Sequence, residues 1–414
     1  MLLEFSCSNH KSIREKVDFS ALAGSDTTRL EDTAQFGKYR ILNSAVIYGA
    51  NGSGKSNFIE AISFLKYLVL NSINHQPGQG IRQQPFKPDG FNTPSVYTIQ
   101  FVRQDMRFLY QFSLKQMLVC DEYLYAFPNG RQMKIFERHG DAFSAGRKFR
   151  GKFDNCKDVL KPNRLMLSCA ANFSSVPEVD TAYQFFRDDM IIYHEGIQQN
   201  WMNYSLHVIA TNPQIKAAII TLMQELDMGV KDIEVKIDKS KLQPGDIPPF
   251  LAPEFRDQLL QSTMDKINAK LIYDNFETDL LGEESRGVRK LFAFLCPFID
   301  IIRNGKVLIC DELEAGLHES LVYGLLKMFM ERHSDSFPQL FFTTHDTSLL
   351  NLDLFRRDQI WLTELKKDRS TDLYSLAEIR NVRKDENLEK GYISGKYGAI
   401  PMLNLDFAKV LSRM

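Results

Sequence analysis

The feature that most constrains this chain is the segment Gly-Ala-Asn-Gly-Ser-Gly-Lys-Ser at residues 49–56. It fits the phosphate-binding pattern G-x-x-x-x-G-K-[ST] at every position. A short apolar run, residues 44–48, precedes it, and residues 56–70 carry apolar side chains at helical spacing. A strand, a Gly-rich turn and a helix in this order point backbone N–H groups at an anion. The sequence therefore predicts an α/β fold with a triphosphate site at this turn.

The residue types in the turn are those that a nucleotide phosphate requires. Lys55 would neutralise the β- and γ-phosphates and act in catalysis, and the Ser56 hydroxyl would bind Mg²⁺. The alternative is an ordinary Gly-rich turn, which the flanking strand and helix disfavour. We expect ATP to be bound by seven consecutive residues: Asn51, Gly52, Ser53, Gly54, Lys55, Ser56 and Asn57.

A second apolar run, residues 307–310, ends in the carboxylates Asp311 and Glu312. Buried parallel strands are continuously apolar, and α/β sheets bind ligands at the carboxyl ends of their strands. We expect Asp311 to bind Mg²⁺ and Glu312 to deprotonate the attacking water. A strand that ends in two acids is commonly only solvated, but its combination with the Gly-rich turn favours the catalytic interpretation.

A third apolar strand, residues 340–342, ends in Thr-Thr-His-Asp. A neutral imidazole of His345 would hydrogen-bond a γ-phosphate oxygen and so sense whether that phosphate is present. A lone His at a strand end is more often structural. The order of the three motifs along the chain favours the catalytic role.

The weakest of the motifs is Ser285-Arg286-Gly287, which opens an apolar helical run. Ser285 and Gly287 would offer a hydroxyl and backbone N–H groups to a phosphate. The alternative is a simple helix cap.

Composition sets limits on the function. The chain has 51 Lys and Arg against 52 Asp and Glu, so bulk charge does not attract it to nucleic acid. Its six Cys form no CxxC pair, which indicates neither a zinc site nor a disulfide framework. The start lacks a signal-peptide pattern, and no apolar stretch approaches the roughly 20 residues of a membrane span. We expect a cytoplasmic protein with no membrane partner.

The pattern along the chain suggests three segments. Residues 1–150 would form an N-terminal ATPase lobe with the Gly-rich turn and a β-meander. Residues 151–275 would form a mainly helical insertion, with a strand near 233–237, a Pro-rich linker over 238–253 and a helix over 254–272. Residues 276–414 would form a C-terminal ATPase lobe that carries the other motifs.

The order of the four motifs resembles that of ABC-type ATPase heads. The wider match looks like the OLD-like and RloA-like ATPases of bacterial abortive infection, a form of antiphage defence. It is carried by five segments, of which the last is the most specific: residues 5–13, 311–318, 343–347, 357–360 and 391–401. The resemblance implies an ABC-ATPase head fold, a mixed β-lobe and P-loop core with an inserted helical lobe.

The resemblance also implies how such heads work. Two copies would bind head to tail, as a dimer or within a higher oligomer, with each ATP between Lys55 of one copy and Ser285 of the other. Arg286, where transporters carry Gly, is a candidate cationic partner for the γ-phosphate. A Q-loop glutamine would join the two lobes, and three candidates are open: Gln83, Gln84 and Gln100.

Related OLD nucleases carry a TOPRIM domain with an Asp-x-Asp pair, and these 414 residues contain no such pair. We therefore expect an ATPase, with slow turnover allowed, that acts as sensor or scaffold and controls a separate effector such as a TOPRIM-type nuclease in response to a phage component. Two alternatives are a DNA-repair ATPase of the SMC or recombination kind that clamps DNA, and a scaffold that holds ATP with little hydrolysis.

The segment 131–164 bears on the first alternative. It holds ten Lys and Arg against four acids, a net charge of +6, with Phe136, Phe143, Phe149 and Phe153 interleaved. Such a composition could bind a phosphate backbone and stacked bases of nucleic acid. The alternative is a solvated hairpin and loop with aromatic residues in the core.

Overall fold

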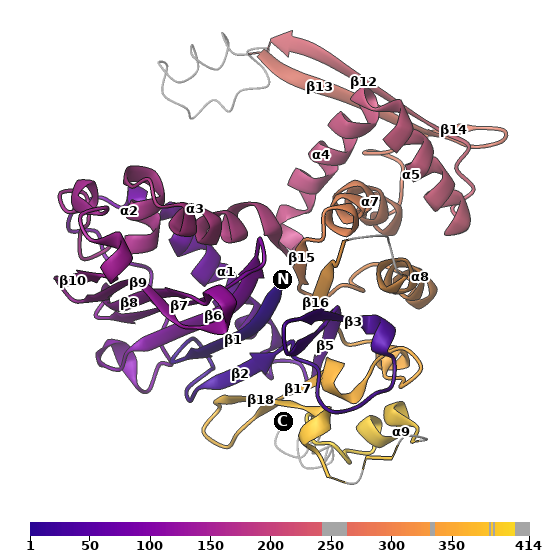
Figure 1. Cartoon of the computed structure of the whole chain (residues 1–414). Coiled ribbons are helices and arrows are strands. Elements are labelled where there is room, and N and C mark those ends of the chain that lie inside the picture. Colours follow the sequence, from indigo (N-terminus) through magenta and orange to yellow (C-terminus); the bar gives the residue numbers. More distant parts are fainter. Residues whose placement is uncertain (242–262, 332–335, 381, 384–385, 402–414) are drawn as a thin grey trace, which may run out of the picture. The chain divides into compact units, whose positions relative to one another are not determined.

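The computed structural model describes residues 1–241, 263–331, 336–380, 382–383 and 386–401 (Figure 1). The chain forms two compact units. The first comprises Met1–Tyr193, Ile302–Glu314 and Lys327–Met414, and the second comprises His194–Ile301 and Ala315–Leu326.

The core of the first unit is a six-stranded sheet. Its order is β11 (Met190–Tyr193), β15 (Val307–Cys310), β16 (Gln339–Thr343), β5 (Ser44–Gly49), β17 (Ile360–Leu365) and β18 (Thr371–Ser375). Only the β17–β18 pair is antiparallel. Every residue of β5, β15 and β16 is buried, as expected for parallel strands covered on both faces. The carboxyl ends of these neighbouring strands therefore meet at one edge of the sheet.

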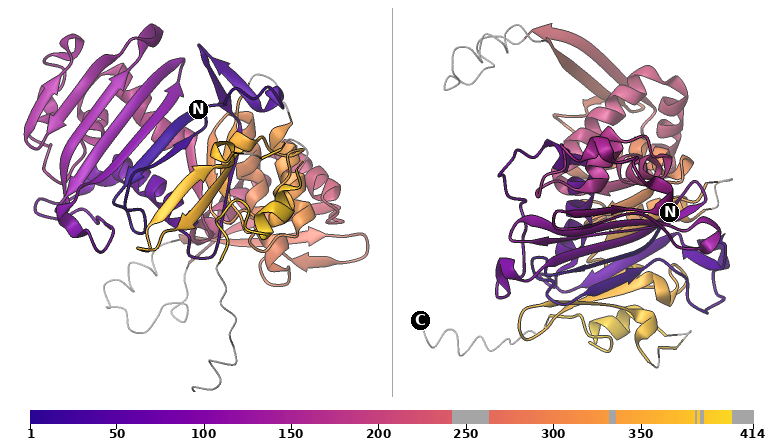
Figure 2. Two further views of the ribbon diagram at one scale, coloured as in Figure 1. Left: turned by 90° about the horizontal axis from the view of Figure 1, so that it is seen from below. Right: turned by 60° about the vertical axis from the view of Figure 1, so that its left-hand side comes forward.

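A seven-stranded antiparallel sheet forms the other half of the first unit (Figure 2). Its order is β10 (Ala142–Ala145), β9 (Met133–His139), β8 (Leu118–Ala126), β7 (Met106–Lys115), β6 (Ser95–Arg103), β1 (Leu2–Ser8) and β2 (Val17–Ser20). Strands β6 and β7 are joined through Gln104 and Asp105, both with positive φ, as a tight hairpin turn requires. A separate hairpin consists of β3 (Thr33–Phe36) and β4 (Tyr39–Leu42).

Helix α1 (Lys55–Asn71) directly follows β5 and the Gly-rich turn. The predicted apolar face is confirmed, since Phe58, Ile62, Leu65 and Val69 are all buried. The ring of Phe58 packs edge-on against Phe5 of β1, with 5.5 Å between ring centroids. The helix is thus fixed against the antiparallel sheet by apolar burial, and its first residues are held at the end of β5.

Helices α2 (Met166–Phe173) and α3 (Pro177–Gln184) also belong to the first unit, over the antiparallel sheet (Figure 1). After α3, the Phe185 ring stacks on Phe101 of β6 with centroids 4.1 Å apart. This burial explains why residues 151–193 do not join the helical insertion that the sequence suggested, so the compact units differ from the three expected segments. The short helix α9 (Leu388–Ile393) lies near the end of the described chain.

The second unit is formed by α4 (Gln198–Thr211), α5 (Pro213–Glu225), most of α7 (Arg286–Arg303), the start of α8 (Glu319–Met330) and a three-stranded antiparallel sheet. The strands are β12 (Asp232–Lys241), β13 (Thr263–Ile272) and β14 (Glu277–Asp279). The strand predicted at 233–237 is confirmed within β12.

The predicted helix over 254–272 is wrong where the structure describes it. Residues 263–272 form strand β13, in which Ala269 and Leu271 are buried while Asn268 and Lys270 are exposed. This alternation has a period of two residues, which is the signature of a strand. Residues 254–262, and residues 242–253 of the expected linker, lie outside the described residues.

The predicted α/β class is confirmed, with a mixed β-lobe and a P-loop core in one unit and an inserted unit of helices and a small sheet. Within the described ranges, none of the helices combines the length and apolar character that crossing a membrane requires.

Candidate functional site

Three motifs that are far apart in the sequence converge at the carboxyl edge of the six-stranded sheet. Strands β15, β16 and β5 are adjacent there and lead into Asp311, His345 and the Gly-rich turn respectively. A cavity of about 570 Å³ opens at this edge. It is lined by residues of all three motifs: Asn51, Gly52, Gly54, Lys55, Ser56, Asn57, Glu312 and His345. The convergence predicted from the sequence is thus found in the first unit.

The backbone of the Gly-rich turn requires glycine at Gly54. Its φ is +110°, and a Cβ placed there would lie 2.0 Å from Thr371 Oγ1 on β18. No other residue fits without moving β18. This close approach brings the turn against β18, and Gly54 itself lines the cavity.

Helix α1 begins at Lys55 without a side-chain cap. The first N–H groups of a helix have no intrahelical partner, and the helix dipole favours negative charge beside them. Because Ser56 and Asn57 of this first turn line the cavity, it offers an anion the environment that phosphate prefers.

The ammonium of Lys55 lies at the base of the turn. Its Nζ donates to the carbonyl oxygens of Gly49 at 2.7 Å and Ala50 at 3.3 Å. Burial lowers the pKa of Lys55 to about 8, against the opposing effect of the charges of Asp311, Glu312 and Glu314. A bound phosphate would add negative charge beside this buried cation and favour its protonated form.

Not every residue of the turn presents its side chain to the cavity. Ser53 is buried, and its Oγ is hydrogen-bonded to Thr363 Oγ1 of β17 at 2.6 Å. The backbone of Ser53 is also engaged, since its N–H donates to Ala50 O at 3.0 Å and its carbonyl oxygen accepts from Thr371 Oγ1 at 2.8 Å. Ser53 therefore does not line the cavity, while Asn51, Ser56 and Asn57 line it directly.

The carboxylates after β15 have different environments. Asp311 Oδ1 accepts a hydrogen bond from Thr343 Oγ1 at 2.6 Å, and Asp311 is not among the cavity-lining residues. Glu312 is exposed and lines the cavity, with φ at +51°. A left-handed backbone at a residue other than glycine costs about 1–2 kcal/mol. Such strain is typical of functional positions, and here it occurs at the expected general base.

His345 lines the same cavity from the end of β16. Its side chain is exposed, and its backbone N–H donates to Glu314 Oε1 at 2.6 Å. Lys55, Glu312 and His345 therefore surround one space, as the sequence predicted.

Ser285 and Gly287 belong to the second unit and do not line this cavity. Ser285 Oγ accepts from Val288 N at 3.2 Å at the start of α7, so it acts as a helix cap in the single chain. Arg286 forms an ion pair with Glu195 on the surface of the same unit. A Cβ on Gly287 would lie 2.8 Å from the carbonyl oxygen of Gly316, so only glycine fits there.

A neighbouring pocket was not predicted from the sequence. It has a volume of about 830 Å³ and a mixed lining that includes Lys11, Ser12, Gln84, Phe86 and Phe91. Asn57 lines both spaces, and its Nδ2 donates to Ser12 Oγ at 2.6 Å. The polar residues after β1 are visible in the sequence. Nothing in the spacing of the motifs indicates that they lie next to the Gly-rich turn.

The three candidate glutamines differ in environment. The Gln83 carboxamide is buried and bonded to Ser95 Oγ, Leu114 O and Met117 N. Gln100 pairs with Glu4 and Arg107. Gln84 is exposed beside the second pocket.

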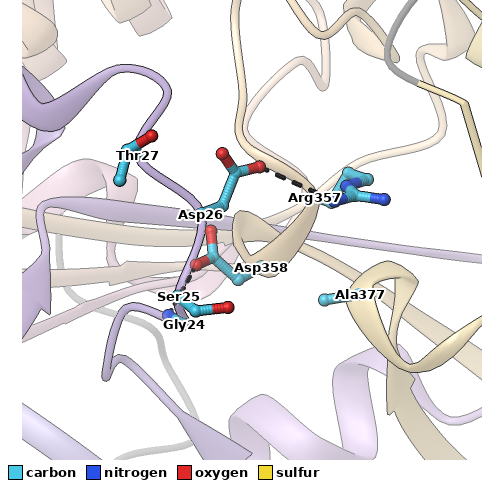
Figure 3. Close-up of a pocket in the computed structure, with 7 residues that line it drawn as sticks. All are labelled: Gly24, Ser25, Asp26, Thr27, Arg357, Asp358 and Ala377. Carbon is cyan, nitrogen blue, oxygen red and sulfur yellow. Dashed lines mark hydrogen bonds and ion pairs between the residues drawn. The ribbon is translucent and has the colours of Figure 1, made fainter.

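A third cavity, of about 440 Å³, lies between the loop 24–27 and residues 357–358 (Figure 3). Asp358 accepts from Gly24 N at 2.8 Å and binds the buried Arg356, while Asp26 faces Arg357 at 3.8 Å. Its charged groups are thus paired with one another and hold the loop in place, so we assign this cavity no ligand.

The aromatic residues of segment 131–164 do not form a base-stacking surface. Phe136, Phe149 and Phe153 are buried in the core of the first unit, and Phe143 is partly buried against Phe153. The alternative interpretation, a hairpin and loop with aromatic residues in the core, is therefore the one that the structure supports.

Eight of the ten cations of the same segment fall into two groups. Some stabilise the structure: Arg138 and Arg164 donate to backbone carbonyl oxygens, and Lys134 and Lys157 pair with acids. Four others are exposed in one loop: Arg147, Lys148, Arg150 and Lys152. The positive charge available to a polyanion is therefore smaller than the net charge of +6 counted from the sequence.

One protein-family model matches more than half of the chain. The family described as "AAA domain, putative AbiEii toxin, Type IV TA system" matches residues 44–158 and 242–351. These ranges contain the Gly-rich turn, both carboxylates and His345. No curated protein matches the sequence.

Three solved structures have a similar fold. An Smc head bound to the C-winged helix domain of ScpA is 15% identical, with a TM-score of 0.45 over 90% of this chain and 97% of that one. The SMC head domain from Thermotoga maritima is 11% identical, with a TM-score of 0.41 over 90% and 98%. An Smc head with an extended coiled coil, bound to the C-terminal domain of ScpA from Pyrococcus furiosus, is 11% identical, with a TM-score of 0.39 over 90% and 96%.

Proposed function

Because the chain belongs to this AAA-domain family, we propose that it is an ATPase that binds ATP with Mg²⁺ and hydrolyses it to ADP and phosphate. The observation that carries the proposal is the shared cavity of Lys55, Glu312 and His345. Three separate segments supply a cation, a carboxylate and an imidazole to one space, next to an uncapped helix N-terminus.

The phosphates fit the turn and the start of α1. Backbone N–H groups there would bind the phosphate oxygens, and Lys55 Nζ would exchange its two carbonyl partners for the β- and γ-phosphates. Ser56 Oγ and Asp311 are the groups suited to Mg²⁺, which prefers oxygen ligands and keeps several waters. When bound, Mg²⁺ would neutralise charge on the transferring phosphoryl group.

The base and ribose of the nucleotide fit the neighbouring pocket. It shares Asn57 with the phosphate cavity, and Phe86 and Phe91 give it an apolar face. Lys11, Ser12 and Gln84 supply polar groups around that face. A pocket with mainly apolar walls and a few polar groups is the usual form of a site for a planar heterocycle.

The chemistry of hydrolysis would be carried out by Glu312 and His345. Glu312 would accept a proton from the water that attacks the γ-phosphorus atom, since its carboxylate lines the cavity. His345 would donate a hydrogen bond to a γ-phosphate oxygen from the adjacent strand end. Calorimetric ATP titration together with phosphate release tests this function, and a wild-type protein that neither binds nor hydrolyses ATP would refute it.

We further propose that ATP joins two copies of the chain head to tail. Ser285 is exposed at the start of α7 and Gly287 follows it, and neither contributes to the cavity of the first unit. In a second copy they could close the nucleotide from the opposite side. Light scattering of Glu312→Gln with ATP should show a dimer that Ser285→Arg abolishes. A monomer under both conditions would contradict the proposal.

At the level of the cell, we propose that the ATPase controls a separate effector, such as a TOPRIM-type nuclease, in antiphage defence and responds to a phage component. The support is the resemblance to abortive-infection ATPases and the AbiEii-type description of the family. Protection of a bacterial host by the gene with its neighbours, lost with Lys55→Ala, tests this level separately from the enzymology.

A further inference from the structure

One buried hydroxyl joins the two strand ends that carry the catalytic residues. Thr343 is the last residue of β16, and the parallel register that pairs Cys310 with Phe342 places it beside Asp311. Its Oγ1 donates to Asp311 Oδ1 at 2.6 Å and accepts from Glu312 N at 2.8 Å. A threonine hydroxyl has a single proton, and the backbone amide of Glu312 can only donate. The proton of Thr343 is therefore directed to Asp311.

This arrangement acts on both carboxylates at once. One oxygen of Asp311 is occupied by the hydroxyl, which restricts rotation of the carboxylate that is proposed to hold Mg²⁺. The amide of Glu312 is held in the left-handed turn that points its side chain into the cavity. Thr343 is fully buried, so water cannot replace either hydrogen bond.

A second contact joins the same strand ends further along. Glu314 Oε1 accepts from the backbone N–H of His345 at 2.6 Å. Its other oxygen, Oε2, is buried and has no hydrogen-bond partner among the described residues. The hydrogen bond from His345 N to Glu314 Oε1 joins the segment after β15 to the segment after β16 and restrains the backbone at His345.

We propose that Thr343 is a positioning residue for ATP hydrolysis, holding Asp311 and the Glu312 turn in their reactive arrangement, and that Glu314 does the same for His345. The inference rests on the proposed ATPase function and extends it to groups that touch neither nucleotide nor water. Partners of this kind around a metal ligand are typically worth 10–100-fold in metal affinity or activity.

The test compares two substitutions at one position. Thr343→Val removes the hydroxyl at nearly constant volume, and Thr343→Ser keeps it. For Thr343→Val we expect kcat to fall about 10–100-fold and the Mg²⁺ concentration for half-maximal rate to rise about tenfold, with KM for ATP within about threefold. Thr343→Ser should restore both quantities to within about threefold of wild type. A merely structural threonine would lower the melting temperature but leave the Mg²⁺ dependence unchanged.

Glu314 supplies an independent pair of variants. Glu314→Gln keeps an acceptor oxygen for the His345 amide, and Glu314→Ala removes it, so only the second should lower kcat, by about tenfold. If Thr343→Val does not fold, Thr343→Ala replaces it with the same expectations.

Wild-type values of kcat and Mg²⁺ dependence in Thr343→Val, or equal losses in Thr343→Val and Thr343→Ser, would overturn the inference and leave the ATPase proposal standing. A wild-type protein without ATP hydrolysis would overturn both, so the two failures are distinguishable.

Discussion

Two regions are conspicuous in the sequence for their charged residues: the carboxyl edge of the six-stranded sheet and the segment 131–164. Their charged side chains have different environments in the structure. At the sheet edge, Lys55, Glu312 and His345 follow the ends of three adjacent strands and line one cavity. In segment 131–164, Arg138 and Arg164 bond to the backbone, Phe149 and Phe153 enter the core, and four exposed cations are spread on a loop. A motif at the end of a buried strand thus predicts a site better than local composition does, because parallel strands impose where their ends meet.

The largest effect should come from the P-loop cation. Lys55→Ala removes the only charge of the turn that faces the phosphates, so nucleotide binding and any protection of host cells should be lost. Calorimetric titration with ATP and Mg²⁺ measures this, with the exposed Lys115→Ala as control. Tight ATP binding by Lys55→Ala would refute the assignment of the turn.

Glu312→Gln should separate binding from chemistry. The amide keeps the shape of the side chain but cannot accept the water proton, so kcat should fall by about 10²–10⁴-fold while the affinity for ATP stays within about threefold. Single-turnover phosphate release measures the rate. An unchanged rate would remove the general-base role and favour the scaffold with little hydrolysis.

The segment 131–164 gives the converse test. Phe149 is buried and Arg150 beside it is exposed, so Phe149→Ala should lower the free energy of unfolding by about 3–5 kcal/mol and Arg150→Ala by less than about 0.5. Urea unfolding followed by circular dichroism gives both values. An unchanged free energy of unfolding in Phe149→Ala would contradict the burial of this ring and favour the base-stacking interpretation.

The buried ammonium at the sheet edge predicts a pH dependence. The pKa of Lys55 is about 8 in the free protein, so the amine is largely neutral above that pH, and phosphate binding must restore the proton. ATP affinity should fall by up to about tenfold for each pH unit above 8, with net proton uptake on binding. Titrations in two buffers of different ionisation enthalpy measure the uptake, and a flat affinity from pH 7.5 to 9.5 would contradict it.

The smallest effect should come from the exposed cations. A variant with Arg147, Lys148, Arg150 and Lys152 all changed to Gln should keep kcat within about twofold, since none of them lines the ATP cavity. Fluorescence anisotropy with a DNA duplex tests the clamping alternative. ATP-dependent DNA binding that falls steeply with salt and is lost in this variant would favour that alternative.

The sequence predicts what depends on local pattern. The strand, turn and helix around Lys55 are visible because spacing and residue type together specify them, and the same holds for the ends of β15 and β16. Strand β13 was missed because a helix was assigned where the apolar residues in fact alternate.

Contacts between distant residues could not be predicted in the same way. Thr343 meets Asp311 only because β15 and β16 pair in a given register. Ser12 meets Asn57 only because the turn after β1 reaches the first turn of α1. Ser285 illustrates a different difficulty, because the same residue pattern is compatible with two roles. It forms a helix cap in the single chain, and it would suit a phosphate contact between two chains.

The most direct measurement is a crystal structure of the Glu312→Gln variant with Mg²⁺ and ATP. We predict the γ-phosphate about 3 Å from Lys55 Nζ, with His345 on the other side and Mg²⁺ beside Ser56. A nucleotide bound elsewhere, for example between the loop 24–27 and residues 357–358, would contradict the account.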